Sequence, residues 1–212
     1  MNKNSIISEK EKTPVLTEMC KCISAGICIG LGAMMKCSVQ NPILGAFLFS
    51  IGLLAVCMFN LTLYTGRVAY LDTYESTEEY LCKMLGYFIG NVAGTGIVSL
   101  LARGDMVFKA TETVLVVEHT GVYTVFMNSI LCGVFIYLAV EGYRRYRTRF
   151  EGTLCLVLCV MGFILTGGRH CIADSAYMLI GNCYPDLEME GRILVAAIGN
   201  GIGALLIRQL IK

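Results

Sequence analysis

The sequence predicts an all-α integral membrane protein, with six transmembrane helices arranged as two inverted repeats of three helices. Three observations lead to this fold class: the composition, the length of two segments and a short internal repeat. Of the 212 residues, 56% are hydrophobic and 16% are charged, which is far more apolar side chain than a soluble domain of this size needs. The net charge of +1 argues against nucleic acid as a partner.

Two segments are too long to be simple membrane helices, which need about 20 residues. Residues 37–66 are thirty residues without a charge, and residues 152–181 are thirty more with a polar cluster near the middle. We expect each segment to be a broken helix whose halves meet near the bilayer centre. Irregular backbone at that depth is tolerated where it faces protein or water instead of lipid.

The second break is expected at Gly167–His170. Adjacent glycines lower helix stability by roughly 1 kcal/mol each relative to alanine, and Arg169 and His170 follow them directly. A charge at the bilayer centre costs on the order of 2.5–3.5 kcal/mol or more, so such residues usually line a cavity and have a function. The alternative is an unbroken helix in which His170 is an ordinary, hydrogen-bonded interior residue.

The remaining elements follow in order along the chain. Residues 1–15 are polar and lack the apolar core of a cleavable signal, so we expect a cytoplasmic N-terminal tail before one transmembrane domain over 16–212. The six spans are expected at 16–35, 37–66, 84–102, 120–140, 152–181 and 193–207. Charged stretches between them are expected to be loops: 72–79, 103–120, 144–149 and 186–190.

Local signals support several of these spans. Gly26, Gly30 and Gly32 give the first span a face of small residues that favours close helix packing. Asn41–Pro42 suits the start of the helix in the second segment, since proline is favoured in a first turn. Arg208 follows the last span.

An internal repeat relates the two halves, 16–105 and 120–212. The pattern I-G-N-x-x-G at Ile89–Gly94 returns 109 residues later at Ile198–Gly203. Three spans per half force the halves into opposite orientations, and interrupted segments at matching positions indicate a substrate path near the midplane. We expect Asn91 and Asn200 to form hydrogen bonds between helices.

Basic residues set the expected orientation. Twelve fall on one side: Lys3, Lys10, Lys12, Lys21, Arg67, Lys83, Arg144, Arg145, Arg147, Arg149, Arg208 and Lys212. Four fall on the other: Lys36, Arg103, Lys109 and Arg192. We therefore expect a multi-pass protein of the cell (inner) membrane with both termini cytoplasmic.

The eleven cysteines do not form a metal or disulfide pattern. They are scattered through apolar segments, and Cys20-Lys21-Cys22 lacks the paired C-x-x-C of a zinc site. We expect reduced cysteines that pack as small apolar residues, and no cofactor or bound metal.

The stretch Gly167-Gly168-Arg169-His170-Cys171-Ile172-Ala173 is similar to the Gly-Phe-Glu-His-Ser-x-Ala-Asn motif of the formate/nitrite transporter family. Leu63-Tyr64-Thr65-Gly66 resembles the family's Leu-Phe-Thr-Gly/Ser loop. The resemblance covers nearly the whole chain after the tail. It implies an aquaporin-like homopentamer with one pore per protomer for small monovalent anions, among them formate, nitrite and hydrosulfide.

The resemblance also implies roles for individual residues. His170 matches the pore histidine, Thr65 the threonine that faces it, and Asn128 an asparagine of the central polar site, with Arg169 beside them on the substrate pathway. The implied constriction residues are Phe49, Leu53, Leu63, Tyr64 and Phe163. Among these, Leu63 matches the inner gate and Phe163 an outer aromatic constriction.

Three positions depart from the family pattern. Arg169 replaces glutamate, Gly168 replaces phenylalanine and Asp174 replaces asparagine. We expect Arg169 and Asp174 to form a compensating pair with exchanged charges. Lys109 is a loose candidate for the basic residue that the family carries before its fourth span.

The site chemistry suggested by the resemblance is proton-assisted passage of a weak-acid anion. An anion in a narrow apolar pore sheds its hydration, which is prohibitive unless its charge is compensated. Half-helix N-termini aim N–H groups at the anion, and a histidine with an unperturbed pKa of about 6.5 exchanges protons at physiological pH. At His170, or through water that it orients, the anion would become a neutral acid.

Three other functions stay open at this point. His170 and Asp174, four residues apart beside Cys171, are a possible metal site of an intramembrane enzyme, although no H-E-x-x-H motif is present. A neutral-solute channel of the aquaporin type would need paired N-P-A motifs, and Asn41-Pro42 is the only Asn-Pro. A scaffold without transport activity would have no use for two interrupted spans.

Overall fold

The structure, a computed structural model, describes residues 14–183 and 187–211. Within these residues it contains nine α-helices and one 3-10 helix. In chain order they are α1 (Val15–Cys37), α2 (Pro42–Met58), α3 (Tyr64–Arg67), η1 (Leu71–Thr73), α4 (Thr77–Ser99), α5 (Asp105–Glu118), α6 (Val122–Arg145), α7 (Phe150–Leu165), α8 (Cys171–Ile180) and α9 (Leu187–Leu210). Four described helices, α1, α4, α6 and α9, are long and apolar enough to cross a membrane, and α2, α7 and α8 are shorter apolar helices.

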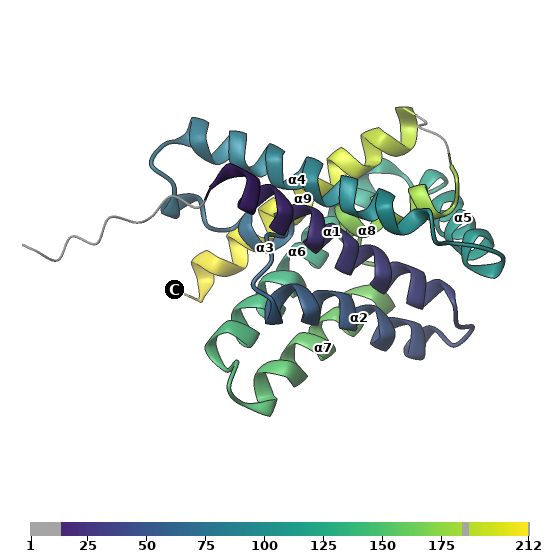
Figure 1. Cartoon of the computed structure of the whole chain (residues 1–212), viewed down its shortest axis with the longest axis horizontal. Coiled ribbons are helices and arrows are strands. Elements are labelled where there is room, and N and C mark those ends of the chain that lie inside the picture. Colours follow the sequence, from purple (N-terminus) through teal and green to yellow (C-terminus); the bar gives the residue numbers. More distant parts are fainter. Residues whose placement is uncertain (1–13, 184–186, 212) are drawn as a thin grey trace, which may run out of the picture.

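The described ends of the chain lie at the same end of the molecule. In Figure 1 the start of α1 and the end of α9 are both on the left, and α5 is on the right. At the left end, Lys83 of α4 pairs with Glu18 of α1, and Arg208 of α9 donates to the carbonyl of Ala69 after α3. We call this end the terminal face and the end that carries α5 the distal face.

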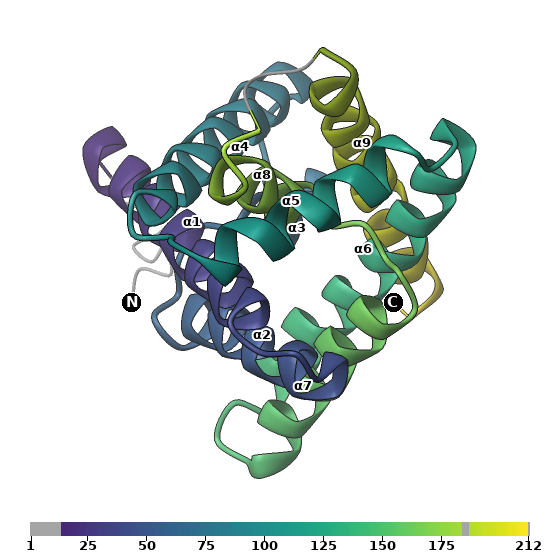
Figure 2. The same cartoon turned by 90° about the vertical axis from the view of Figure 1, so that its right-hand side faces the viewer.

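The helices surround a centre that two short helices occupy. Figure 2 shows α4, α1, α2, α7, α6 and α9 around the outside, with α3 and α8 between them and α5 across the distal face. The contacts agree, because α8 packs on α1, α4, α5 and α9, and α3 packs on α4, α6 and α9. The two short helices thus bring their N-terminal ends into the interior.

The two longest helix pairs cross at glycines in the same way. Between α1 and α4, a Cβ built on Gly94 would lie 2.1 Å from the carbonyl oxygen of Ile23. Between α6 and α9, a Cβ on Gly203 would lie 2.0 Å from the carbonyl oxygen of Ile130. Only glycine allows this backbone approach. Since α1 begins at the terminal face and α6 ends there, the two similar pairs run in opposite directions (Figure 1).

Asn91 of α4 supports the start of α3. Its side-chain oxygen accepts the backbone N–H of Tyr64 at 2.8 Å, and its amide donates to the carbonyls of Thr62 at 2.9 Å and Cys22 of α1 at 2.8 Å. Asn91 is fully buried, so these bonds satisfy polar groups that no water reaches.

Asn200 of α9 does the same for α8. It accepts the N–H of Cys171 at 3.0 Å and donates to the carbonyls of Arg169 and Ser129, both at 2.8 Å. The prediction that Asn91 and Asn200 form hydrogen bonds between helices is confirmed. The I-G-N-x-x-G repeat is therefore a repeated structural device that holds the first turn of each short central helix.

Several predicted boundaries need correction. Residues 103–120 are not a polar loop, because α5 occupies 105–118 with Ala110, Val114 and Val117 buried. These residues lie on one helical face, and the charged residues between them mask that periodicity in the sequence. The predicted acidic loop at 72–79 is shorter than expected, since Ser76 caps α4 by accepting the N–H of Glu79 at 3.1 Å.

Other long helices extend beyond their predicted ends. Arg144 and Arg145 belong to the last turn of α6 instead of a loop, and α9 begins at Leu187, within the predicted acidic loop. Uncharged length underestimates a membrane helix whose ends carry charged residues. The predicted tail at 1–15 falls almost wholly outside the described residues, as does Asp186.

Candidate functional site

A buried hydroxyl–imidazole pair lies where the two short helices begin. His170 is the N-cap residue of α8, and Thr65 belongs to the first turn of α3. Thr65 Oγ1 and His170 Nε2 are 2.9 Å apart, and both residues are 2% exposed. The structure thus brings together two residues that are 105 positions apart in the sequence.

The other ring nitrogen fixes the tautomer of His170. The backbone N–H of Ala173 donates to Nδ1 at 3.1 Å, which caps α8. A nitrogen that accepts carries no proton, so we assign the neutral ring with its hydrogen on Nε2, where it donates to Thr65 Oγ1. The hydroxyl hydrogen of Thr65 then remains available for a third group.

Two phenylalanine rings pack one after the other next to the ring of His170. The Phe163 ring of α7 stacks on His170 with centroids 6.0 Å apart and planes at 25°. Phe49 of α2 meets Phe163 edge-on, with centroids 6.0 Å apart and planes at 86°. Both phenylalanines are 2% exposed, so the pair is flanked by a dry aromatic wall.

The turn between α7 and α8 places the histidine. Gly167 has a φ of +77°, a conformation that favours glycine, and the Gly168 N–H donates to the Phe163 carbonyl at 2.7 Å. The Asn128 carbonyl of α6 accepts the Arg169 N–H at 3.2 Å. The backbone of Asn128 therefore lies beside the turn, and the predicted role of its side chain at the central polar site stays a prediction.

Arg169 and Asp174 form an ion pair beside the site. Arg169 Nη2 lies 3.4 Å from Asp174 Oδ1, and their side chains are 16% and 3% exposed. This is the pairing expected for exchanged charges. The buried Nε of Arg169 has no hydrogen-bond partner within the described residues. The Asp174 carboxylate thus faces the Arg169 guanidinium.

The other predicted constriction residues are placed differently. Leu53 and Leu63 are 1% and 2% exposed in the main apolar core, and Leu63 is the N-cap residue of α3. The Tyr64 ring packs edge-on against Phe88 of α4, and its hydroxyl donates to the carbonyl of Ala197 in α9 at 3.2 Å. Tyr64 thus points toward α4 and α9, and its constriction role stays a prediction.

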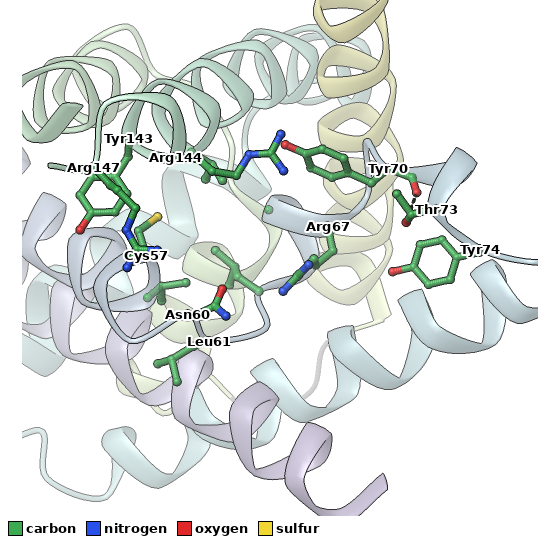
Figure 3. A pocket seen from close by; sticks show the side chains of 14 residues that line it. Cys57, Asn60, Leu61, Arg67, Tyr70, Thr73, Tyr74, Tyr143, Arg144 and Arg147 are labelled. Carbon is green, nitrogen blue, oxygen red and sulfur yellow. Dashed lines mark hydrogen bonds between the residues drawn. The ribbon is translucent and has the colours of Figure 1, made fainter. Parts of the chain in front are cut away.

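A cavity of about 270 Å³ opens on the terminal face (Figure 3). Leu63 and Gly66 line it, so it reaches the turn that carries Thr65. Three arginines line it from different segments: Arg67, Arg144 and Arg147. No aspartate or glutamate is among its lining residues. The cavity is therefore a positively charged mouth, which we call the arginine mouth.

A buried cluster around Glu141, which the sequence did not reveal, shapes this mouth. The buried Glu141 of α6 accepts the Tyr70 hydroxyl at 2.8 Å and pairs with Arg144 and Arg145, each at 2.8 Å. Burial and the neighbouring carboxylate raise the pKa of Tyr70, so its hydroxyl stays a donor. The one signal in the sequence was an acidic residue, Glu141, at the end of an otherwise apolar span.

Two lysines near the distal face are also engaged. Lys109, the predicted candidate for the basic residue of the family pattern, donates to the Val39 carbonyl at 2.8 Å. Lys36 lies over the Tyr177 ring at 4.7 Å from its centroid, within electrostatic range of Arg169 and Asp174. Lys36 of α1 is therefore a second basic residue beside the Arg169–Asp174 pair. No group of three or more His, Cys, Asp or Glu in the described part of the chain is arranged to hold a metal.

This fold and site define a helical membrane protein with two similar halves and a buried polar pair between their short helices. A family model described as "Formate/nitrite transporter" matches residues 4–212, so the chain belongs to the formate/nitrite transporter family. The predicted resemblance is confirmed.

Solved structures share the fold. An "FNT family ion channel" superimposes with a TM-score of 0.80 at 19% identity, covering 92% of this chain and 88% of that one. A "Pentameric formate channel with formate bound" gives a TM-score of 0.78 at 18% identity, covering 92% and 95%. No curated protein sequence matches the chain.

Proposed function

We propose that this protein is a channel for small monovalent weak-acid anions, namely formate, nitrite or hydrosulfide, in the cell (inner) membrane. In this proposal the chain crosses the membrane six times with both termini in the cytoplasm. The pairs α2–α3 and α7–α8 are the broken second and fifth spans. In support, each pair consists of an apolar helix of 16 or 17 residues and a shorter helix that continues from an interior turn.

The observation that carries the proposal is the Thr65–His170 pair. The pair offers the Thr65 hydroxyl hydrogen in a buried interior. The arginine mouth lies on one side of the pair, and the Phe49 and Phe163 rings lie on the other. The proposed route passes Leu63 at the mouth, then Thr65 and His170 with Asn128 and Arg169 beside them, and then Leu53, Phe49 and Phe163. The apolar residues on this route favour a neutral acid over an anion.

The proposed proton step uses both ring nitrogens. Proton uptake at Nδ1 displaces the Ala173 N–H and leaves the imidazolium. Nε2 then gives its proton to Thr65 Oγ1 while the Thr65 hydroxyl gives its own proton to the anion. The products are a neutral ring protonated on Nδ1 and an uncharged acid. Losing the capping bond costs about 0.5–2 kcal/mol, so the first turn of α8 loosens with each transfer.

The test is uptake into proteoliposomes measured for formate, nitrite and hydrosulfide across a range of pH. For the unchanged protein we expect one pH profile that all three anions share, because one histidine governs the step. For His170→Asn we expect slower uptake, with a pH profile that differs among the three anions and follows the pKa of each conjugate acid. His119→Asn is the matched control, since His119 is the other histidine and is exposed.

Two outcomes would contradict the proposal. An unchanged pH profile in His170→Asn removes the proton step. Water or glycerol flux that exceeds formate flux points to a neutral-solute channel instead.

The proposed assembly is a homopentamer with one pore per protomer. The support is the fold shared with a solved structure whose title describes a pentameric formate channel. Native mass spectrometry in detergent is expected to give five copies of the chain, and a stable monomer that transports formate would contradict this assembly.

A further inference from the structure

We propose that the arginine mouth is a binding site for a phosphate-bearing anion that is too large to pass Leu63, and that its occupancy blocks entry to the pore. The inference rests on the proposed transport function for its consequence, but not for the binding itself. The hydrogen-bond donors, the charge and the size of the cavity indicate this ligand class.

The first observation is a surplus of donors. Among the residues lining the mouth, Arg67, Arg147, Tyr143 and Asn60 make no side-chain hydrogen bond or ion pair within the described part of the chain. In Figure 3 these labelled side chains surround the same space from α3, from α6 and the segment after it, and from the turn after α2. Guanidinium groups present several N–H donors in a planar fork that matches phosphate oxygens.

The second observation is that the arginines of the mouth differ in whether they form an ion pair. Arg144 is ion-paired with the buried Glu141, which it shares with Arg145. Arg67 and Arg147 form no ion pair among the described residues, and Glu18 acts on Arg67 only at longer range. Two guanidinium groups outside any ion pair suit an anion with two or more negative charges better than a monovalent one. The mouth is also open to solvent, since Arg67 and Arg147 are exposed.

The third observation is size. The volume of about 270 Å³ is close to the lower end of roughly 300 Å³ that is typical of small-molecule sites. A formate-sized anion would leave most of this volume to water. A pyrophosphate or a lipid phosphate headgroup would occupy more of this volume and cover Leu63, through which the proposed route continues.

Binding is tested on the purified full-length protein with radiolabelled pyrophosphate in equilibrium dialysis. We expect saturable binding that weakens as salt is added, and an affinity about tenfold or more lower in the double variant Arg67→Gln/Arg147→Gln, because charge-assisted bonds are lost. Arg149→Gln is the matched control, since Arg149 is exposed in the same α6–α7 connection but does not line the mouth. Equal affinity in the double variant, or no saturable binding, overturns the inference.

A second arm separates the two sources of phosphate. Pyrophosphate binding is compared in nanodiscs of zwitterionic lipid and of mixed zwitterionic and phosphatidic acid lipid. Equal affinity in both indicates a free phosphate ligand, and weaker binding with phosphatidic acid indicates that a lipid headgroup competes for the same site. Either result supports a phosphate site, provided that the double variant Arg67→Gln/Arg147→Gln abolishes pyrophosphate binding in both kinds of nanodisc.

The blocking role is tested in proteoliposomes with pyrophosphate on one side. Formate flux is expected to fall when pyrophosphate faces the mouth, and the fall is expected to disappear in the double variant. If formate is not transported but pyrophosphate binds, the proposed function fails and the binding site stands. If formate is transported and binding is absent, only this inference fails.

Discussion

At the scale of single residues, the site depends on which atom of each side chain is already engaged. His170 uses Nδ1 to cap α8 and Nε2 to meet Thr65, so both ring nitrogens have partners before any substrate arrives. In this arrangement the hydroxyl hydrogen of Thr65 is the donor that remains available to a substrate. We therefore expect Thr65 to be as important for transport as the histidine itself.

Removing that hydroxyl while keeping the shape tests this expectation. Thr65→Val leaves the buried Nε2–H of His170 without an acceptor, a loss of about 1–3 kcal/mol, and we expect formate flux to fall by about tenfold or more. Thr65→Ser keeps the hydroxyl and is expected to retain most of the flux. Flux is measured in proteoliposomes at matched protein content. Equal flux in the valine and serine variants would contradict a role for the hydroxyl.

The Arg169–Asp174 pair gives a second prediction at this scale. Asp174→Asn leaves a largely buried guanidinium without its counter-charge, and breaking a buried pair on one side typically costs about 3–5 kcal/mol. We expect a lower thermal unfolding temperature in detergent. The double variant Arg169→Gln/Asp174→Asn removes both charges and is expected to recover most of the loss. A double variant no more stable than the single one would show that the pair is not coupled.

At the scale of elements, the two short helices are held by equivalent asparagines on α4 and α9. Each asparagine joins the N-terminal residue of a short helix to the carbonyl two positions earlier and to a neighbouring long helix. The backbone before each short helix is thereby fixed. Thr65 and His170 meet because both turns are held in this way.

Replacing either asparagine is expected to loosen one short helix. Asn91→Ala and Asn200→Ala each leave buried backbone groups unpaired, at about 1–3 kcal/mol per group, so both lower the unfolding temperature in detergent. Asn200→Ala is expected to reduce formate flux as well, because it frees the turn that carries His170. Faster hydrogen exchange at 62–66 in one variant and at 169–173 in the other would locate the effect. Exchange unchanged in both regions would contradict it.

At the scale of the whole molecule, two helix pairs of opposite direction cross at matching glycines. Each pair presents backbone against backbone, and this fixes the distance between the elements that carry the site. The arginine mouth on the terminal face and the buried pair in the centre keep their positions only if both crossings remain tight. We therefore expect the glycines at the crossings to be intolerant of any side chain.

Alanine substitutions at matched glycines test this. A Cβ on Gly94 or Gly203 would lie within 2.1 Å of a backbone oxygen, so we expect loss of folded protein in gel filtration for either alanine variant. Gly86→Ala in α4 and Gly191→Ala in α9 are the controls, because a Cβ there has nothing within 4 Å. These are expected to be neutral or stabilising by about 0.5–1 kcal/mol, as alanine favours a helix. Folded Gly94→Ala protein would contradict the close crossing.

The sequence by itself determined the membrane class, the family, the repeat and the identity of the residues at the buried pair. Apolar length, the I-G-N-x-x-G pattern and the motif around His170 are all local in the chain, and so they were readable from it. It did not reveal α5, whose buried residues are spaced along one face among charged neighbours.

Only the tertiary structure decided how these residues are used. The tautomer of His170 depends on Ala173, the orientation of Tyr64 depends on α4 and α9, and the arginine mouth is assembled from three segments with the Glu141 cluster beside it. Such contacts join residues far apart in the chain. Their partners are set by helix packing, because the distances and the buried hydrogen-bond donors that define the site exist only once the helices have come together.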